Sequence, residues 1–525
     1  MRIPALRRAA VLAAATLIST LALAQASTPQ QQTQAPQTQP QPQVQPPQIQ
    51  PPQAKPHADT HITPAQAREL FASVDTILQF ASTDSKLAIK HRVKRRLTTR
   101  DQVVAYLTSK MKEDKDARRL ERSELVLKKF GLLDQDFHLQ PFLVSLLKEQ
   151  VAGYYDAKTK TVNLLDWIPP DAQKPVLAHE LTHALQDQRV GLEKWEDQSV
   201  EGLSHSVADD NRHIASDEAD TAREAAVEGQ AMAVLIDYEL KPAGRTILSN
   251  PNVVRKMTEP QSSMADSPVL ARAPLVLQQS LLFPYTEGLK FEADVLQNKG
   301  ADAAFAGVLD RPPATSFEIM NPEAYEQKIK VPVLTMPDVH ELLDRDYNPY
   351  DVGVMGELDV RMLTQLFGGP ELSDALTDEW SGGIYYVVQK EDAPNKNSTA
   401  SISLVYLSQW RTPEAANAFA KMYAGELGQQ FSGVKPDPQD VSNENEQAYK
   451  TNEGPVLIST EGNFVFLSES FPLPLARKLQ FLMVGAQSDD DNNVTARSQP
   501  TQSLTGGLVR FFQSCGMMRA ALHLY

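Results

Sequence analysis

The stretch VLAHELTHALQDQR, residues 176–189, constrains the fold of this chain more than any other feature. It holds two histidines four positions apart, His179 and His183, with Glu180 directly after the first. Residues i and i+4 project from one face of an α-helix, so both imidazoles can converge on one point if the stretch is helical. Its apolar positions give the backing that a buried helix needs. The sequence therefore predicts a buried helix that presents two histidines on one face.

Two imidazoles on one helix face are typical of a zinc site, and catalytic zinc usually takes three protein ligands and a water. One class of such sites has a glycine three positions and a third histidine six positions after the second histidine. Gln186 and Arg189 occupy those positions here, so that class is excluded. The other class takes a glutamate from a later helix, and residues 216–240 (SDEADTAREAAVEGQAMAVLIDYEL) fit, with acids crowding the predicted first turn.

The inserted segment between these two predicted helices, residues 190–218, contains two further histidines. His205 and His213 therefore stay open as alternatives for the third ligand. The same segment is long enough to act as a lid or as a self-inhibitory element.

HELTH followed by AVEGQA resembles the gluzincin zinc metallopeptidases, the thermolysin-like group, in which the third ligand is a glutamate often found in an EG-x-A context. The resemblance implies Glu228 as the third ligand of Zn²⁺. Glu224, one turn earlier on the same face, is the alternative. Gly229 favours Glu228, because a glycine permits the close helix approach that the site requires.

Three more segments resemble secreted bacterial proteins of the Peptidase MA-like type: EQVAGYYDAKTKTVNLLD, FPYTEGLKF and RPPATSFEIMNPEAY. The likeness extends over roughly residues 65–345. In gluzincins the strand before the zinc helix commonly forms the edge of the cleft. Residues 162–165 would have that position and would bind a peptide by strand addition.

The resemblance implies a peptidase in which zinc activates a water and Glu180 is the general base. An oxyanion donor is also expected, and Tyr285 and Tyr238 are the candidates. Asp187, one turn beyond His183, is a candidate for orienting a histidine ring. The expected partner is a peptide or protein substrate.

A second function class remains: a non-catalytic envelope protein that keeps a structural zinc site and works as a binding scaffold. Glu180 separates the two classes, because a structural site needs no base beside its first ligand. The sequence therefore favours the exported metallopeptidase over the scaffold.

The amino-terminal region is typical of an exported protein. Residues 1–26 read as a secretory signal, with arginines before an apolar run and Ala-Gln-Ala as the cleavage site. The apolar run is shorter than the roughly 20 residues that cross a bilayer, so no stable transmembrane segment is expected after signal removal. Residues 27–58 are rich in Pro and Gln and predict a disordered linker. We expect a periplasmic or extracellular location.

Charge and cysteine content limit the partners and the sources of stability. Removing the signal takes away three arginines and no acid, which moves the formal charge from −15 to −18 and argues against nucleic acid as a partner. The single cysteine, Cys515, cannot form an intrachain disulfide, so packing or metal must stabilise the fold. The oligomeric state is not encoded in any pattern found.

The remaining pattern predicts an α+β fold in two parts. Residues 59–345 predict a mostly helical, gluzincin-like metallopeptidase domain with a short β-hairpin or edge strand in YYDAKTKTVNLL. Residues 346–486 alternate apolar strands with a few helices and predict a small α+β module. Residues 487–525 predict a disordered tail.

Overall fold

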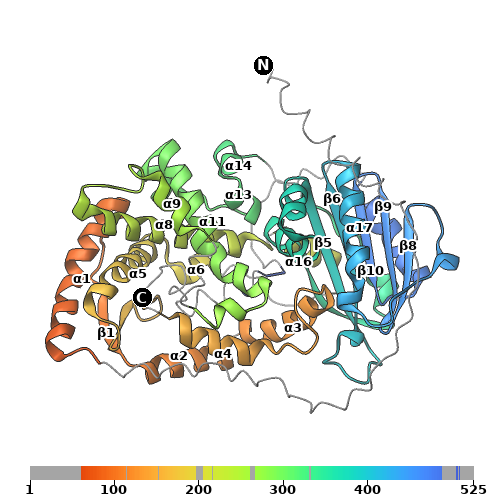
Figure 1. Ribbon diagram of the computed structural model, residues 1–525, viewed down its shortest axis with the longest axis horizontal. Coiled ribbons are helices and arrows are strands. Elements are labelled where there is room, and N and C mark those ends of the chain that lie inside the picture. Colours follow the sequence, from red (N-terminus) through yellow and green to blue (C-terminus); the bar gives the residue numbers. More distant parts are fainter. Residues whose placement is uncertain are drawn as a thin grey trace, which may run out of the picture. The chain divides into compact units, whose positions relative to one another are not determined.

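Helices and two β-sheets combine in an α+β fold (Figure 1). The computed structural model describes residues 61–113, 115–151, 153–196, 205–215, 217–259, 267–329 and 333–487, and positions 504, 505 and 508. The predicted secretory signal and the whole Pro/Gln-rich linker lie outside these residues. The α+β class is thus confirmed, whereas the division at residues 345 and 346 stays a prediction.

The first helix begins where the capping pattern places it. The side chain of Thr63 accepts from the backbone N–H of Gln66, and the Gln66 side chain accepts from the backbone N–H of Thr63. Pro64 then fits the first turn, where its missing N–H costs nothing. The helices before the metal motif are α1 (Pro64–Ser85), α2 (Arg100–Glu113), α3 (Lys115–Lys129) and α4 (Leu139–Gln150).

A small sheet precedes the HELTH motif, residues 179–183, in the chain. Its strand order corrects the expectation of an edge strand at residues 162–165. Strands β2 (Tyr154–Asp156) and β3 (Thr161–Leu165) form the predicted antiparallel hairpin. Strand β1 (Lys94–Thr98) pairs with β3 in parallel, so the order is β1-β3-β2. Residues 162–165 are therefore central, and the prediction of an edge strand there was wrong. The reason is a long-range pairing with a basic stretch that local pattern does not reveal.

Three long helices form the core around the motif: α5 (Pro170–Val190), α8 (Ala219–Leu240) and α11 (Leu275–Lys299). Helices α8 and α11 touch through backbone, because a Cβ on Gly229 would lie 2.1 Å from the carbonyl oxygen of Gly288. A Cβ on Gly288 would in turn lie 2.1 Å from the carbonyl oxygen of Ala225. Gly229 does permit a close helix approach, but its partner is α11.

The connections between these elements are mostly short helices. Between α5 and α8 lie α6 (Leu192–Glu196) and α7 (Val207–Ile214). The others are η1 (Lys241–Ala243), α9 (Pro251–Met257), η2 (Leu270–Arg272), the π-helical turn η3 (Asp302–Gly307), α12 (Val308–Asp310), α13 (Ser316–Met320), α14 (Pro322–Gln327) and α15 (His340–Leu343).

A seven-stranded antiparallel sheet follows, in the order β4-β5-β6-β10-β9-β8-β7. Its strands are β4 (Tyr347–Val354), β5 (Trp380–Lys390), β6 (Ile402–Trp410), β7 (Lys435–Pro436), β8 (Glu446–Thr451), β9 (Gly454–Glu461) and β10 (Phe464–Glu469). The helical segments are α16 (Glu357–Thr377), η4 (Thr399–Ser401), α17 (Pro413–Gln430), η5 (Pro438–Asp440) and α18 (Leu473–Gly485). The predicted alternation of apolar strands with a few helices is confirmed, whereas β4 and β7 were not predicted.

The sheet is covered on both faces, and alternate residues of each strand belong to different cores. Tyr385 and Tyr406 share a core with residues of α17, whereas Tyr386 and Leu407 share one with residues of α18. Since neighbouring side chains on a strand point to opposite faces, α17 and α18 cover opposite faces of the sheet. This explains why the central strands are buried almost throughout.

Part of the predicted disordered tail is packed. Leu504, Thr505 and Leu508 are buried, and the Thr505 hydroxyl bonds to the carboxylate of Asp359 on α16. The rest of residues 488–525 lies outside the described residues.

No helix among the described residues carries an apolar stretch long enough to cross a membrane.

Candidate metal centre

Three buried side chains from two helices converge on one point. Nε2 of His179 lies 2.9 Å from Nε2 of His183 and 2.9 Å from Oε2 of Glu228. Nε2 of His183 lies 3.4 Å from the same carboxylate oxygen. Helix α5 supplies both imidazoles at the predicted i, i+4 spacing, and α8 supplies the carboxylate.

The donor set fits a zinc ion. Two imidazole nitrogens and one carboxylate oxygen are common zinc ligands, and tetrahedral bonds near 2.0–2.1 Å place ligand atoms about 3.3 Å apart. The observed separations lie close to that value, and all three ligand atoms fall within 4.8 Å of one another. Three atoms that can each present a lone pair face the same small volume. A cation between them is the arrangement that satisfies all three.

Electrostatics at the centre also favour a cation. Burial lowers the pKa of His179 to about 4, so this ring is neutral near pH 7. Burial acts in the same direction on His183, but the Glu228 carboxylate outweighs it and raises the pKa of His183. Burial alone would raise the pKa of Glu228, yet the neighbouring His183 lowers it to about 2. The carboxylate is therefore ionised and attracts positive charge.

Glu180 lies beside this trio without being part of it. The side chain is buried, and its Oε2 accepts the backbone N–H of Tyr155 on β2 at 2.7 Å. Burial raises the pKa of Glu180 to about 7, although the nearby His183 opposes the shift. The carboxylate is thus fixed between the motif helix and the edge strand of the small sheet.

Gln186 orients one of the rings, a role that the sequence analysis missed. Its amide Nε2 donates to the carbonyl of Val227 and to Oε1 of Gln230, both at 2.9 Å. Its Oε1 is therefore the acceptor that faces Nδ1 of His183, at 2.8 Å. With Nδ1 protonated, Nε2 of His183 keeps its lone pair for a metal. The i+3 spacing from His183 was the available signal.

Asp187 does not orient a histidine, contrary to the prediction. Its carboxylate accepts from the hydroxyl of Tyr155 at 2.8 Å, from Nζ of Lys160 at 2.7 Å and from the backbone N–H of Leu192 at 3.1 Å. The Asp187 side chain lies a full turn further along α5, about 6 Å from His183 along the axis, where Tyr155 and Lys160 of the β2-β3 hairpin face it. Asp187 therefore ties the hairpin to the end of α5.

The two tyrosine candidates have different places. Tyr285 on α11 is buried, and its ring centroid lies 6.4 Å from that of His179. Tyr238 is half-buried near the end of α8, and its ring packs against Phe80 at 5.3 Å. Ten residues of helix separate it from Glu228, about 15 Å along the axis. Only Tyr285 therefore lies beside the histidines.

The other candidates for the third ligand do not belong to the group formed by His179, His183 and Glu228. Glu224 is buried on α8, one turn before Glu228. His213 is buried on α7, and its Nε2 lies 3.7 Å from Oδ1 of Asp217. His205 is exposed and bonds to Asp344. Among the described residues, the structure thus brings Glu228 to the two motif histidines and not these three.

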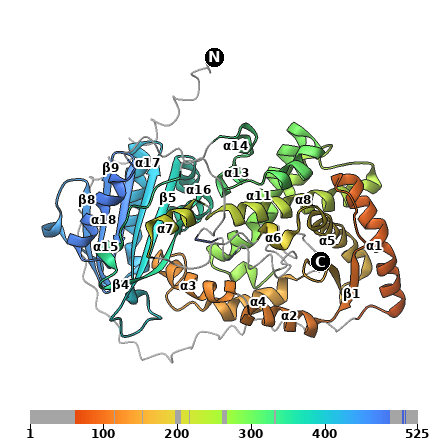
Figure 2. The ribbon, with the colours of Figure 1, turned by 180° about the vertical axis from the view of Figure 1, so that it is seen from behind.

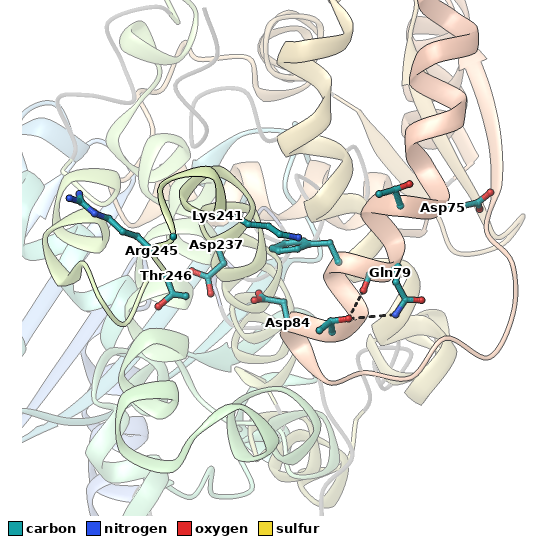
Figure 3. A pocket seen from close by; sticks show the side chains of 11 residues that line it. Asp75, Gln79, Asp84, Asp237, Lys241, Arg245 and Thr246 are labelled. Carbon is teal, nitrogen blue, oxygen red and sulfur yellow. Dashed lines mark hydrogen bonds between the residues drawn. The ribbon is translucent and has the colours of Figure 1, made fainter.

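An open cavity of about 900 Å³ lies between α1 and the end of α8 (Figure 3). Asp84, Asp237 and Lys241 line it, and Figure 3 shows the two carboxylates on facing helices. Asp237 lies nine residues beyond Glu228, about 14 Å along α8. The cavity is therefore separate from the candidate chemistry.

No family model, curated protein or solved structure matches this chain.

Proposed function

We propose that this protein is an exported zinc-dependent metallopeptidase of the gluzincin type that hydrolyses peptide bonds. The observation that carries the proposal is the convergence of His179, His183 and Glu228 with Glu180 fixed beside them. A structural zinc site takes four protein ligands and needs no base beside them. A buried carboxylate next to the three side chains, held outside the trio, supports hydrolysis.

The chain's own residues supply the remaining parts of the reaction. Zinc, when bound, would polarise the substrate carbonyl and make the attacking water acidic, with a pKa of about 7. Glu180 takes a proton from that water on its carboxylate as the water attacks the carbonyl carbon. It then delivers the proton to the amine nitrogen as the C–N bond breaks. The Tyr285 hydroxyl is the candidate donor to the oxyanion.

The substrate is expected to lie along β2 instead of β3. The Tyr155 N–H points to Glu180 and not into the β2-β3 pair, so the outer edge of β2 faces the metal centre. An extended peptide that adds to this edge would pass its carbonyl groups by Glu180. Binding by strand addition, expected from the sequence at β3, is therefore proposed at β2.

Replacement of the proposed base is the first test. We expect Glu180→Gln to keep its zinc and to lose hydrolysis of casein by at least about a hundredfold, because the amide cannot take a proton. Glu239→Gln, an exposed change near the end of α8, is the matched control and should behave as the parent chain does. Unchanged hydrolysis in Glu180→Gln would exclude the mechanism. If the parent chain binds zinc but does not hydrolyse casein, the result would favour the non-catalytic scaffold function.

Zinc content tests the ligand set separately. Glu228→Ala should bind zinc much more weakly at this centre, whereas Glu224→Ala should retain it, because only the Glu228 carboxylate reaches both histidines. Metal analysis after dialysis measures both. Retention by the first variant with loss by the second would reverse the assignment.

A further inference from the structure

A second group of potential metal ligands lies outside the proposed active centre. Nδ1 of His205 lies 2.8 Å from Oδ2 of Asp344, and Nδ1 of His340 lies 3.4 Å from Oδ1 of the same carboxylate. The three ligand atoms all fall within 4.8 Å of one another. His340 is buried, whereas the His205 side chain is 59% exposed and that of Asp344 35% exposed. The group thus has a rigid inner ligand and an open outer side.

His340 is oriented as metal-binding histidines usually are. Its Nε2 faces Oδ2 of Asp210 at 3.0 Å, and Asp210 is itself 3% exposed. A histidine that binds a metal through one ring nitrogen typically donates its other N–H to a carboxylate. With the Nε2 proton directed to Asp210, Nδ1 of His340 presents its lone pair toward Asp344 and His205.

The backbone that carries these residues is fixed. The Asn211 side chain donates to the carbonyl of Met336 at 2.7 Å and accepts its N–H at 2.8 Å. These bonds join α7 to the segment that leads into α15. Figure 2 shows α7 against strand β4, on the side of the sheet where α15 lies. The ligands therefore come from two segments held together independently of any metal.

The surrounding charge is negative. Asp209, Asp210 and Asp338 lie near the group in addition to Asp344, and electrostatic repulsion among them acts on Asp210. Arg212 pairs with Asp209 at 2.6 Å, and His340 acts on Asp210 in the opposite direction to the neighbouring acids. A divalent cation at the group would relieve the repulsion.

We propose that His205, His340 and Asp344 form a second zinc site, distinct from the active centre. Two imidazoles and one carboxylate are a zinc donor set, and water completes the coordination on the exposed side. The site would tether the segment between the two ligand helices, at His205, to the segment that enters the large sheet, at Asp344. The metal would add a cross-link to the Asn211 hydrogen bonds that already join these segments, and it does not depend on the proposed catalytic activity.

Zinc content of the full chain tests this site. We expect His205→Ala to bind one zinc fewer per chain than the parent after dialysis against Zn²⁺. Asp344→Asn should show the same loss. The difference between parent and variant is the measurement, so the result does not depend on whether the active centre also binds zinc. Asp210→Asn should weaken the second site by about 10- to 100-fold, as loss of an orienting carboxylate does.

His91→Ala is the matched control, because His91 is an exposed histidine that does not belong to this group. It should bind as much zinc as the parent. Since His205 is exposed, its replacement leaves the core intact, and folding is checked by circular dichroism. Equal zinc content in His205→Ala and the parent would overturn the second site and leave a network of His–Asp hydrogen bonds. Loss of zinc in His205→Ala with the control unchanged would establish it.

Discussion

Gln186 connects the candidate metal centre to two neighbouring helical segments through a single amide. It accepts from His183, donates to α8 at Val227 and Gln230, and Gln230 continues to the carbonyls of Ala304 and Phe305. In the sequence, Gln186 served only to exclude the class of zinc sites that has a glycine at this position. In the structure, its side chain orients the imidazole ring of His183. Gln186 has this effect because its side chain lies beside His183 on α5 and faces Val227 and Gln230 on α8.

We expect Gln186→Leu to weaken zinc binding at the active centre by about 10- to 100-fold, because His183 loses the acceptor that fixes its tautomer. Competition with a zinc chelator measures the affinity. Gln230→Leu is the control, since it removes the outer hydrogen bonds and leaves the contact between His183 and Gln186 in place. Equal affinities in both variants and the parent would show that Gln186 does not orient the ring.

At the level of elements, the crossing of α8 and α11 sets where Glu228 lies. Gly229→Ala would force a methyl group to 2.1 Å from the carbonyl oxygen of Gly288, so one helix must move. We expect a loss of about 3 kcal/mol in the free energy of unfolding, measured with urea, and weaker zinc binding. Gly428→Ala in α17 meets nothing within 4 Å and should stabilise by up to about 1 kcal/mol. An unchanged free energy of unfolding in Gly229→Ala would show that α8 and α11 are not in backbone contact.

The cavity between α1 and α8 gives a pH-dependent prediction. Burial, together with the nearby Asp237, raises the pKa of Asp84 from its usual value of 3.8 to about 7. The folded chain therefore binds this proton more tightly than the unfolded chain does. Above pH 7, the ionised Asp84 carboxylate therefore lowers the free energy of unfolding. This loss disappears as the pH falls toward 4.

We expect Asp84→Asn to be more stable than the parent by about 1–2 kcal/mol at pH 8, after allowance for partial solvent exposure. The difference should vanish near pH 4, where Asp84 is protonated in the parent. Thermal unfolding at the two pH values measures it. Thr83→Ala, in the same helix and cavity, is the control and should change the stability equally at both pH values, because it removes no titratable group. A pH-independent difference for Asp84→Asn would contradict the assignment.

At the scale of the whole described chain, a buried ion pair joins the helical region to the large sheet. Nζ of Lys129, at the end of α3, lies 2.7 Å from Oε2 of Glu453 and 2.7 Å from the hydroxyl of Ser470. The Lys129 side chain has no exposed surface. These contacts link positions more than 300 residues apart in the sequence.

Lys129→Met should lower the free energy of unfolding by about 3–5 kcal/mol, because it leaves the Glu453 carboxylate buried without its cation. Urea unfolding is the measurement. Lys158→Met, whose ammonium is exposed and 3.9 Å from Glu193, should change stability by less than about 0.5 kcal/mol. Adding Glu453→Gln to Lys129→Met should recover most of the loss. No recovery would mean that packing, and not charge, explains the effect.

The parts of the fold that depend on local pattern could be predicted from the sequence. Capping at Thr63, the helical spacing of the two motif histidines and the β2-β3 hairpin each involve residues close together in the chain. The strand and helix order after residue 346 follows from alternating apolar positions in the same way. The α+β class and the elements that carry the candidate ligands are therefore encoded locally.

Only the tertiary structure decided which distant residues meet. Sequence spacing allowed Glu224 as well as Glu228, and the rotation of α8 against α5 brings Glu228 to the histidines. Likewise, β1 makes β3 a central strand from 67 residues away, and His205 reaches Asp344 across 139 residues. Local propensities act over a few residues, whereas burial and pairing select among many possible long-range contacts. The sequence by itself determined the motif helix and the positions of His179, Glu180 and His183 on it, and packing determined which carboxylate meets the two histidines and which strand forms the edge of the small sheet.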